Sequence, residues 1–116
     1  MFKFRAKGTP RRIPGKRNGL EREFEEILKS RVASGELVWY DFEAITFKLG
    51  TDCRYTPDFA TMHASGDLVC YETKGHMQED ARVKMKTLVR LFPVRLILVQ
   101  RRLKRDGGGF SETEIE

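Results

Sequence analysis

Apolar residues recur at helical spacing in two stretches of the chain. The first stretch predicts a helix that begins near Gly19, with Asn18 as its N-cap and Ser34-Gly35 as its stop. The second predicts a helix over residues 78–92, which Pro93 ends. The apolar positions of the two stretches are Leu20, Phe24, Ile27, Leu28, Val32, Ala81, Met85, Leu88, Val89 and Phe92. Each helix therefore presents one apolar face to a core.

The segments between and after these helices are typical of strands. Residues 37–49 are rich in aromatic and β-branched side chains, which predicts one long strand or two strands with a bend. Residues 56–63 and 68–74 predict two further strands joined by a turn at 65–67, and the mostly apolar run 94–100 predicts a buried one. The order α-β-β-β-α-β predicts an α+β (α/β) domain with a mixed central sheet flanked by helices.

The length of the chain, 116 residues, fits one domain. We expect a basic N-terminal arm (1–18), a folded domain (19–105) and a flexible acidic tail (106–116). The sequence contains no apolar run near the roughly 18 residues that cross a bilayer and no signal peptide, so we expect a cytoplasmic protein. Its two cysteines have no paired spacing and predict neither a disulfide framework nor a zinc site.

Basic residues gather in two segments. Residues 1–18 hold seven basic residues and no acidic one, so they account for the whole net charge of +5, and residues 82–105 hold nine with no Asp or Glu. A polyanion held from two sides would explain this pattern, and a solvated arm beside an ordinary helix face is the alternative. The candidate nucleic-acid contacts are Lys7, Arg11, Arg12, Lys16, Arg17, Arg82, Lys84 and Lys86.

The predicted hairpin carries the candidate chemistry. If residues 64–66 form a three-residue loop with Gly66 in the left-handed conformation, His63 pairs with Asp67 and Asp58 lies opposite Glu72. Like charges opposed at about 4.5–5.5 Å between Cβ atoms are destabilising. A hard divalent cation such as Mg²⁺ would compensate them. A two-residue turn would instead shift the pairing by one and put the two acids on opposite faces.

Lys74 lies two residues after Glu72, so both side chains point to the same face of the strand. An ammonium group beside a metal-bound carboxylate pair can orient or deprotonate water, or neutralise charge on a phosphate. The pattern therefore predicts phosphodiester hydrolysis by in-line attack. The alternative is an exposed hairpin with scattered charges.

Glu21 is a candidate third carboxylate at the edge of the first helix. The pattern Asn18-x-x-Glu21 is also that of a capping box, in which the Glu21 side chain would bind backbone amides. From the residues alone the two interpretations stay equal. Of the remaining candidates, we expect His63 at the surface, His76 without a role, and Trp39 in the core.

Pro57-Asp58 followed by Glu72-Thr73-Lys74 resembles the PD-(D/E)XK nuclease signature. A wider set of segments, in order along residues 6–105, is similar to the phage endonuclease I family of Holliday-junction resolvases. These segments are Ala6-Lys7-Gly8, Gly19-Leu20-Glu21, Tyr55-Thr56-Pro57-Asp58-Phe59, Glu72-Thr73-Lys74-Gly75 and Glu79-Asp80-Ala81-Arg82-Val83-Lys84.

The resemblance implies a restriction-endonuclease-like core and a Mg²⁺-dependent endonuclease, with Mn²⁺ as a substitute, that cuts branched DNA. It implies Asp58, Glu72 and the Thr73 carbonyl as metal ligands, Lys74 as the catalytic lysine and Glu21 as a further catalytic carboxylate. It also implies a homodimer and, for a phage protein, the host cytoplasm. The alternatives are a restriction- or recombination-type nuclease subunit whose partner supplies specificity, and a non-catalytic DNA-binding module.

Overall fold

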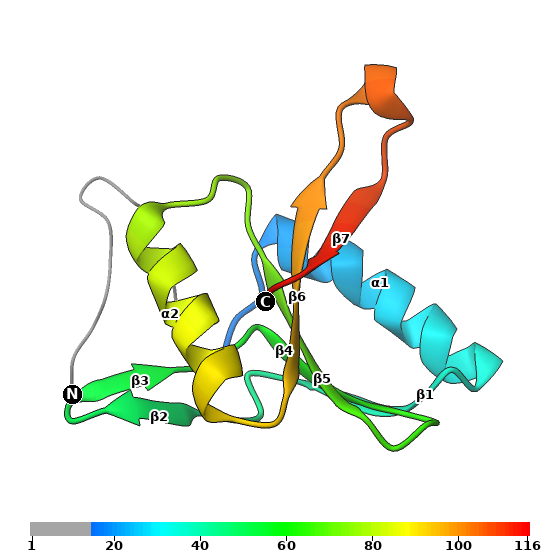
Figure 1. Cartoon of the computed structure of the whole chain (residues 1–116). Coiled ribbons are helices and arrows are strands. Elements are labelled where there is room, and N and C mark those ends of the chain that lie inside the picture. Colours follow the sequence, from blue (N-terminus) through cyan, green and yellow to red (C-terminus); the bar gives the residue numbers. More distant parts are fainter. Residues whose placement is uncertain (1–14) are drawn as a thin grey trace.

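Two helices cover opposite faces of a five-stranded mixed sheet in the computed structural model, which describes residues 15–116 (Figure 1). The elements are, in chain order, α1 (Gly19–Ser34), β1 (Leu37–Phe42), β2 (Phe47–Gly50), β3 (Cys53–Tyr55), β4 (Phe59–His63), β5 (Leu68–Thr73), α2 (Glu79–Leu91), β6 (Arg95–Arg101), the 3₁₀ turn η1 (Lys104–Asp106) and β7 (Phe110–Glu114). The predicted α+β class is therefore confirmed.

The strand order in the main sheet is β1-β4-β5-β6-β7. Strands β5 and β6 are parallel, and the other neighbouring pairs are antiparallel. The parallel pair requires a crossover, which α2 provides between β5 and β6. Strands β2 and β3 form a separate ribbon, whose Phe47 ring lies 5.0 Å from the ring of Phe92 beyond α2.

Successive residues of each central strand contribute to different cores. Val69 and Tyr71 of β5 pack with Phe24 and other residues on the α1 side, whereas Cys70 packs with Met85 and other residues on the α2 side. This alternation follows from the two-residue period of a strand. Glu72, one residue after Tyr71, therefore points to the α2 side.

The helix boundaries agree closely with the predicted ones. Helix α1 begins directly after Asn18, whose side chain and that of Glu21 form the reciprocal capping box. It ends at Gly35, which has a φ of 87° and so adopts the left-handed conformation that favours glycine. Helix α2 is one residue shorter at each end than the predicted stretch 78–92.

The predicted strand over 37–49 is two strands, β1 and β2, which belong to different sheets. The chain bends at Glu43, which has a φ of 50°, and the backbone N–H of Glu43 donates to the Asp58 carbonyl. The strand expected to start at residue 56 starts at Phe59, and β3 was missed by the prediction. The core position expected for Trp39 is wrong, because β1 is an edge strand and this side chain is 42% exposed.

The expectation of a flexible acidic tail over residues 106–116 is also wrong. Residues Phe110–Glu114 form the edge strand β7 against β6, and Ile115 is buried on the α2 side. The acidic residues that suggested a loose tail instead pair with basic ones, as Glu114 does with Arg95 at 2.8 Å. The folded domain therefore extends to Ile115. No helix within residues 15–116 combines the length and the apolar character needed to cross a membrane.

Candidate active site

The β4–β5 hairpin has the register that the three-residue loop predicts. Phe59 pairs with Tyr71 and Ala60 with Cys70, and the His63 N–H donates to the Asp67 carbonyl at 3.0 Å. Gly66 has a φ of 95°, the left-handed conformation on which this register depends. Continued by one residue, the same register sets Asp58 across from Glu72.

Asp58 and Glu72 are held together by hydrogen bonds. The backbone N–H of Asp58 donates to Glu72 Oε1 at 3.1 Å. Both the backbone N–H and the hydroxyl of Thr73 donate to Asp58 Oδ2 at 2.8 Å. Both acids are buried, with 2% of Asp58 and 5% of Glu72 exposed. The two acids therefore lie together, and hydrogen bonds hold a carboxylate oxygen of each.

Lys74 lies on the same side as Glu72, as predicted. Its Nζ is 3.2 Å from Glu72 Oε2, and its backbone N–H donates to the Val99 carbonyl of β6. The Lys74 side chain is 31% exposed, so its ammonium group lies between the buried carboxylates and solvent. A substrate approaching from solvent would meet this ammonium group beside the carboxylate pair.

Burial and the neighbouring charge of Asp58 raise the pKa of Glu72 to about 8, although Lys74 acts in the opposite direction. Tyr55 of β3 completes this environment. Burial and the Glu72 charge raise the pKa of Tyr55 well above its ordinary value, so its hydroxyl stays protonated beside the carboxylate. The Tyr55 hydroxyl lies within reach of Glu72 and acts to lower the pKa of Glu72, although its geometry is not that of a well-aligned hydrogen bond. Tyr55 lies three residues before Asp58 in the segment that carries the family resemblance, but the pattern of residues assigned it no role in the site.

The donor set fits a hard divalent cation. Mg²⁺ prefers oxygen ligands and is bound in many proteins by one or two carboxylates together with water and substrate phosphate. Asp58 and Glu72 supply the carboxylates, and the Thr73 hydrogen bonds orient one of them from outside, as supporting groups do in metal sites. Within residues 15–116, no group of three or more His, Cys, Asp or Glu side chains lies close enough to hold a metal ion. The chain itself would therefore leave most of the coordination positions to water and substrate.

Glu21 is buried at the start of α1, with 2% of the residue exposed. Its Oε1 accepts the Asn18 N–H at 2.8 Å, so the capping interpretation is confirmed. The start of α1 lies at the same end of the molecule as Asp58, because the Arg17 guanidinium stacks 4.5 Å from the Phe42 ring and the next residue, Glu43, bonds to Asp58. A catalytic role for Glu21 in addition to capping stays a prediction.

The candidate nucleic-acid contacts differ in what already engages them. Lys7, Arg11 and Arg12 lie outside the described residues. Lys16 is exposed, whereas Arg17 forms an ion pair with Glu25 at 2.5 Å and stacks on Phe42. Arg17 is thus used in part for internal contacts.

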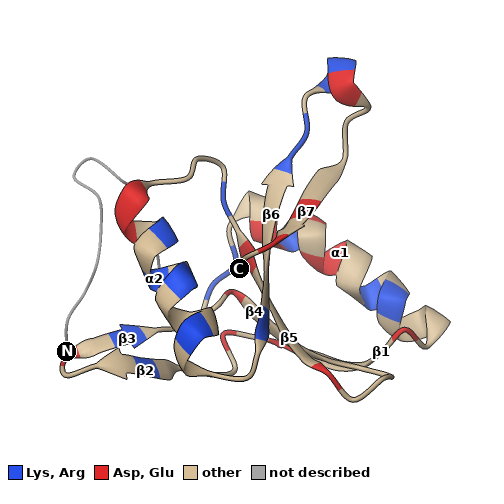
Figure 2. Cartoon of the chain, in the orientation of Figure 1, with Lys and Arg blue, Asp and Glu red and all other residues tan. Residues whose placement is uncertain are grey.

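On α2, Arg82 and Lys86 are exposed one turn apart, and Lys84 donates to the Arg54 carbonyl at 2.9 Å. Figure 2 shows the basic residues of α2 in succession along the helix. This helix covers the face of the sheet to which Glu72 points, so its exposed cations lie on the side of the molecule that carries the candidate site.

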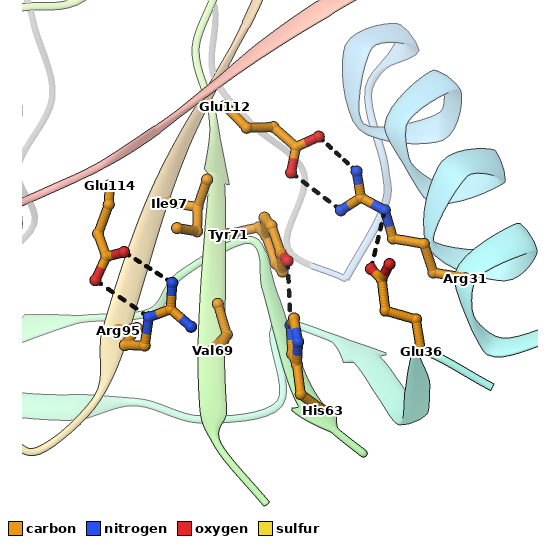
Figure 3. A pocket seen from close by; sticks show the side chains of 9 residues that line it. All are labelled: Arg31, Glu36, His63, Val69, Tyr71, Arg95, Ile97, Glu112 and Glu114. Carbon is orange, nitrogen blue, oxygen red and sulfur yellow. Dashed lines mark hydrogen bonds and ion pairs between the residues drawn. The ribbon is translucent and has the colours of Figure 1, made fainter. Parts of the chain in front are cut away.

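A shallow pocket of about 350 Å³ lies on the other face, between α1 and the β6–β7 edge (Figure 3). Its apolar floor is formed by Val69, Tyr71 and Ile97. Around it lie two arginine–glutamate pairs, Arg31 with Glu112 and Arg95 with Glu114, and His63, which bonds to the Tyr71 hydroxyl at 3.3 Å. The pocket contains neither Asp58 nor Glu72 and is distinct from the carboxylate site.

No protein-family model, curated protein or solved structure matches the chain. The family resemblance therefore depends on the motif residues themselves and on the way in which the fold arranges them.

Proposed function

We propose that the chain is a Mg²⁺-dependent endonuclease of the PD-(D/E)XK type that hydrolyses DNA phosphodiester bonds, with branched DNA as its preferred substrate. One observation carries this proposal above all others. Two buried carboxylates, Asp58 and Glu72, are held together across an antiparallel pair, and Lys74 lies on the same side at 3.2 Å from Glu72. An arrangement that raises the pKa of Glu72 to about 8 is costly for folding and is explained if it serves to bind a cation.

Each residue has a defined part in this proposal. Asp58 and Glu72 would hold Mg²⁺ or Mn²⁺, with the Thr73 carbonyl as a further ligand. The bound ion would lower the pKa of water and reduce the charge of the scissile phosphate. Lys74 Nζ would orient the attacking water or neutralise charge that develops on the phosphate. Tyr55 and Thr73 would hold the carboxylates in position.

The preference for branched DNA and a homodimeric assembly are proposed from the family resemblance alone. The exposed cations of α2, Arg82 and Lys86, support a polyanionic substrate in general, because phosphate contacts release bound counterions.

The test is cleavage of a supercoiled plasmid, a linear duplex and a synthetic four-way junction, each with Mg²⁺ and with EDTA. We expect Mg²⁺-dependent cutting, strongest on the junction, that Asp58→Asn abolishes. A matched control is Asp67→Asn, which removes an exposed carboxylate at the far end of the same hairpin. Tight DNA binding without cleavage in Mg²⁺ would indicate a DNA-binding module instead of an enzyme. Cutting of linear duplex and junction at equal rates would keep the enzyme and remove the branched-DNA preference.

A further inference from the structure

The β6–β7 hairpin extends beyond the rest of the sheet. The pairing of β6 with β5 ends at Val99, opposite Thr73, whereas its pairing with β7 continues to Arg101, opposite Phe110. Residues 100–110, which we call the hairpin arm, therefore project past the end of β5 (Figure 1). The arm carries Arg101, Arg102, Lys104 and Arg105 and a single acidic residue, Asp106, all of them exposed.

The arm has a defined shape. The Arg102 N–H donates to the Gly109 carbonyl at 2.9 Å, and the Gly108 N–H donates to the Leu103 carbonyl at 3.0 Å. Gly107, Gly108 and Gly109 all have positive φ values, of 101°, 66° and 68°, which other residues adopt only with strain. The glycine run thus closes a compact turn, and a partner would bind the arm without first having to order it.

The charges at the tip of the arm differ from those at its base. At the base, Arg101 pairs with Glu23 of α1 at 2.5 Å. At the tip, neither Lys104 nor Arg105 makes an ion pair with any residue in the range 15–116. Figure 2 shows both basic and acidic segments in the turn at the projecting end of the β6–β7 hairpin. The tip therefore presents unneutralised positive charge to solvent.

The arm projects from the end of the sheet that holds the candidate site. The Lys74 N–H donates to the Val99 carbonyl, so Lys74 lies beside the last residue of β6 that still has a neighbour in β5. Lys104 is five residues beyond Val99, which corresponds to at most about 17 Å at the roughly 3.3 Å rise of a strand residue. This reach is about half of the roughly 34 Å helical turn of duplex DNA.

We propose that the hairpin arm is a duplex-binding element, in which Lys104 and Arg105 contact backbone phosphates about half a helical turn from the phosphate at the carboxylate pair. Leu103, which is 56% exposed beside these two cations, lies against the sugar edge of the groove between them. The inference rests on the proposed function for the identity of the polyanion. Since phosphate contacts carry no base information, the arm sets position and affinity and not sequence preference.

The test compares the double variant Lys104→Gln/Arg105→Gln with the wild type. Binding to a 30-base-pair duplex is measured in EDTA, where no cutting occurs, over a series of KCl concentrations. We expect affinity to fall about 10- to 50-fold at moderate salt and the slope of log K against log salt to decrease in magnitude by about 1.8, the value for two phosphates. The matched control, Lys29→Gln/Lys48→Gln, removes two exposed cations elsewhere, and we expect less than a threefold change in affinity.

The outcomes separate this inference from the proposed nuclease. If the double variant has unchanged affinity and salt slope while the wild type cuts DNA, the proposed role of the arm is wrong and the proposed nuclease activity stands. If the double variant loses affinity while the wild type cuts no DNA with Mg²⁺ or Mn²⁺, the proposed role of the arm stands and the proposed nuclease activity is wrong. If the control variant loses as much affinity for duplex DNA, the loss is due to the change in net charge, and the arm is not a specific DNA-binding element.

Discussion

Tyr71 and Glu72 are neighbours in β5, and their side chains point to opposite faces of the sheet. The charged residues on the two faces are paired in different ways. On the α1 side, the pocket with Tyr71 in its floor has two glutamates, Glu112 and Glu114, each held by both nitrogens of an arginine fork (Figure 3). On the α2 side, Glu72 accepts the backbone N–H of Asp58, whose negative charge lies close enough to act on the pKa of Glu72. The pKa of Glu114 is lowered by its bonds to Arg95, whereas the pKa of Glu72 is raised by burial and by Asp58.

This difference separates charges that support the fold from charges that oppose it. Each pocket pair joins opposite charges that are partly exposed to solvent, so each adds a modest amount to stability. The Asp58–Glu72 pair is buried and alike in sign, so it lowers stability unless a cation joins it. The Asp58–Glu72 pair lowers the stability of the fold. We therefore assign a function to the charged residues on the α2 side and a structural role to those on the α1 side.

The largest expected effect is on the cleavage rate, and it distinguishes Lys74 on the α2 side from Arg95 in the pocket. We expect Lys74→Ala to lower the rate of Mg²⁺-dependent cleavage by about 100- to 1,000-fold, the range for removing one group that stabilises a transition state. DNA binding should stay within about threefold of the wild type. Arg95→Ala, which removes a cation of the pocket, should leave cleavage nearly unchanged. Equal losses in the two variants, measured under single-turnover conditions, would remove the distinction between the two sides.

The next effect concerns stability and pH. Because the pKa of Glu72 is raised in the folded state, from 4.5 to about 8, folding favours the protonated form, and this contribution to stability is lost as pH rises through this interval. Glu72→Gln should remove that loss, so the variant should be more stable than the wild type at pH 8.5, by up to about 5 kcal/mol at the roughly 1.4 kcal/mol that corresponds to one pKa unit. Near pH 4 the two should be nearly equal. Urea unfolding at both pH values measures the difference.

The matched variant for this experiment is Glu114→Gln. The pKa of Glu114 is lowered by Arg95, so its contribution to stability is present at neutral pH and is lost only in acid. Glu114→Gln should therefore leave the profile between pH 6 and pH 9 parallel to that of the wild type. A Glu72→Gln profile that is also parallel to the wild type over this range would show that neither burial nor Asp58 raises the pKa of Glu72.

The smallest effect separates the two roles of Glu21. A glutamine at position 21 keeps an oxygen for the Asn18 N–H, so Glu21→Gln should preserve the melting temperature. If the charge of this buried carboxylate also supports the site, cleavage should fall about tenfold. Asn18→Ala, which removes the cap, should instead cost about 1 kcal/mol of stability and leave the rate intact. Unchanged cleavage in Glu21→Gln would restrict this residue to capping.

Local patterns in the sequence were sufficient to predict the helices and the carboxylate pair. The Asn18–Glu21 capping box and Gly66 in the hairpin loop are short-range signals, and each fixes a boundary or a register without help from distant residues. Because the side chains of a strand alternate, Glu72 and Lys74 lie on one side of β5, and the register at Gly66 sets Asp58 across from Glu72.

Other features depended on partners far away in the sequence. Strand β7 was missed because its acidic residues suggest a loose tail until Arg95 and Arg31 are known to lie opposite them. Trp39 was misplaced because nothing local reveals that β1 is the edge of the sheet. Tyr55 escaped notice because its contact with Glu72 depends on how the β2–β3 ribbon packs. Non-local pairing is the information that local pattern lacks.

The central claim is that Asp58 and Glu72 together bind a divalent cation, and direct titration of the protein with Mn²⁺, followed by electron paramagnetic resonance, tests it without any substrate. The account predicts saturable binding that Asp58→Asn and Glu72→Gln each abolish and that Glu114→Gln leaves unchanged. Binding that survives in Asp58→Asn, or that disappears equally in Glu114→Gln, would contradict it.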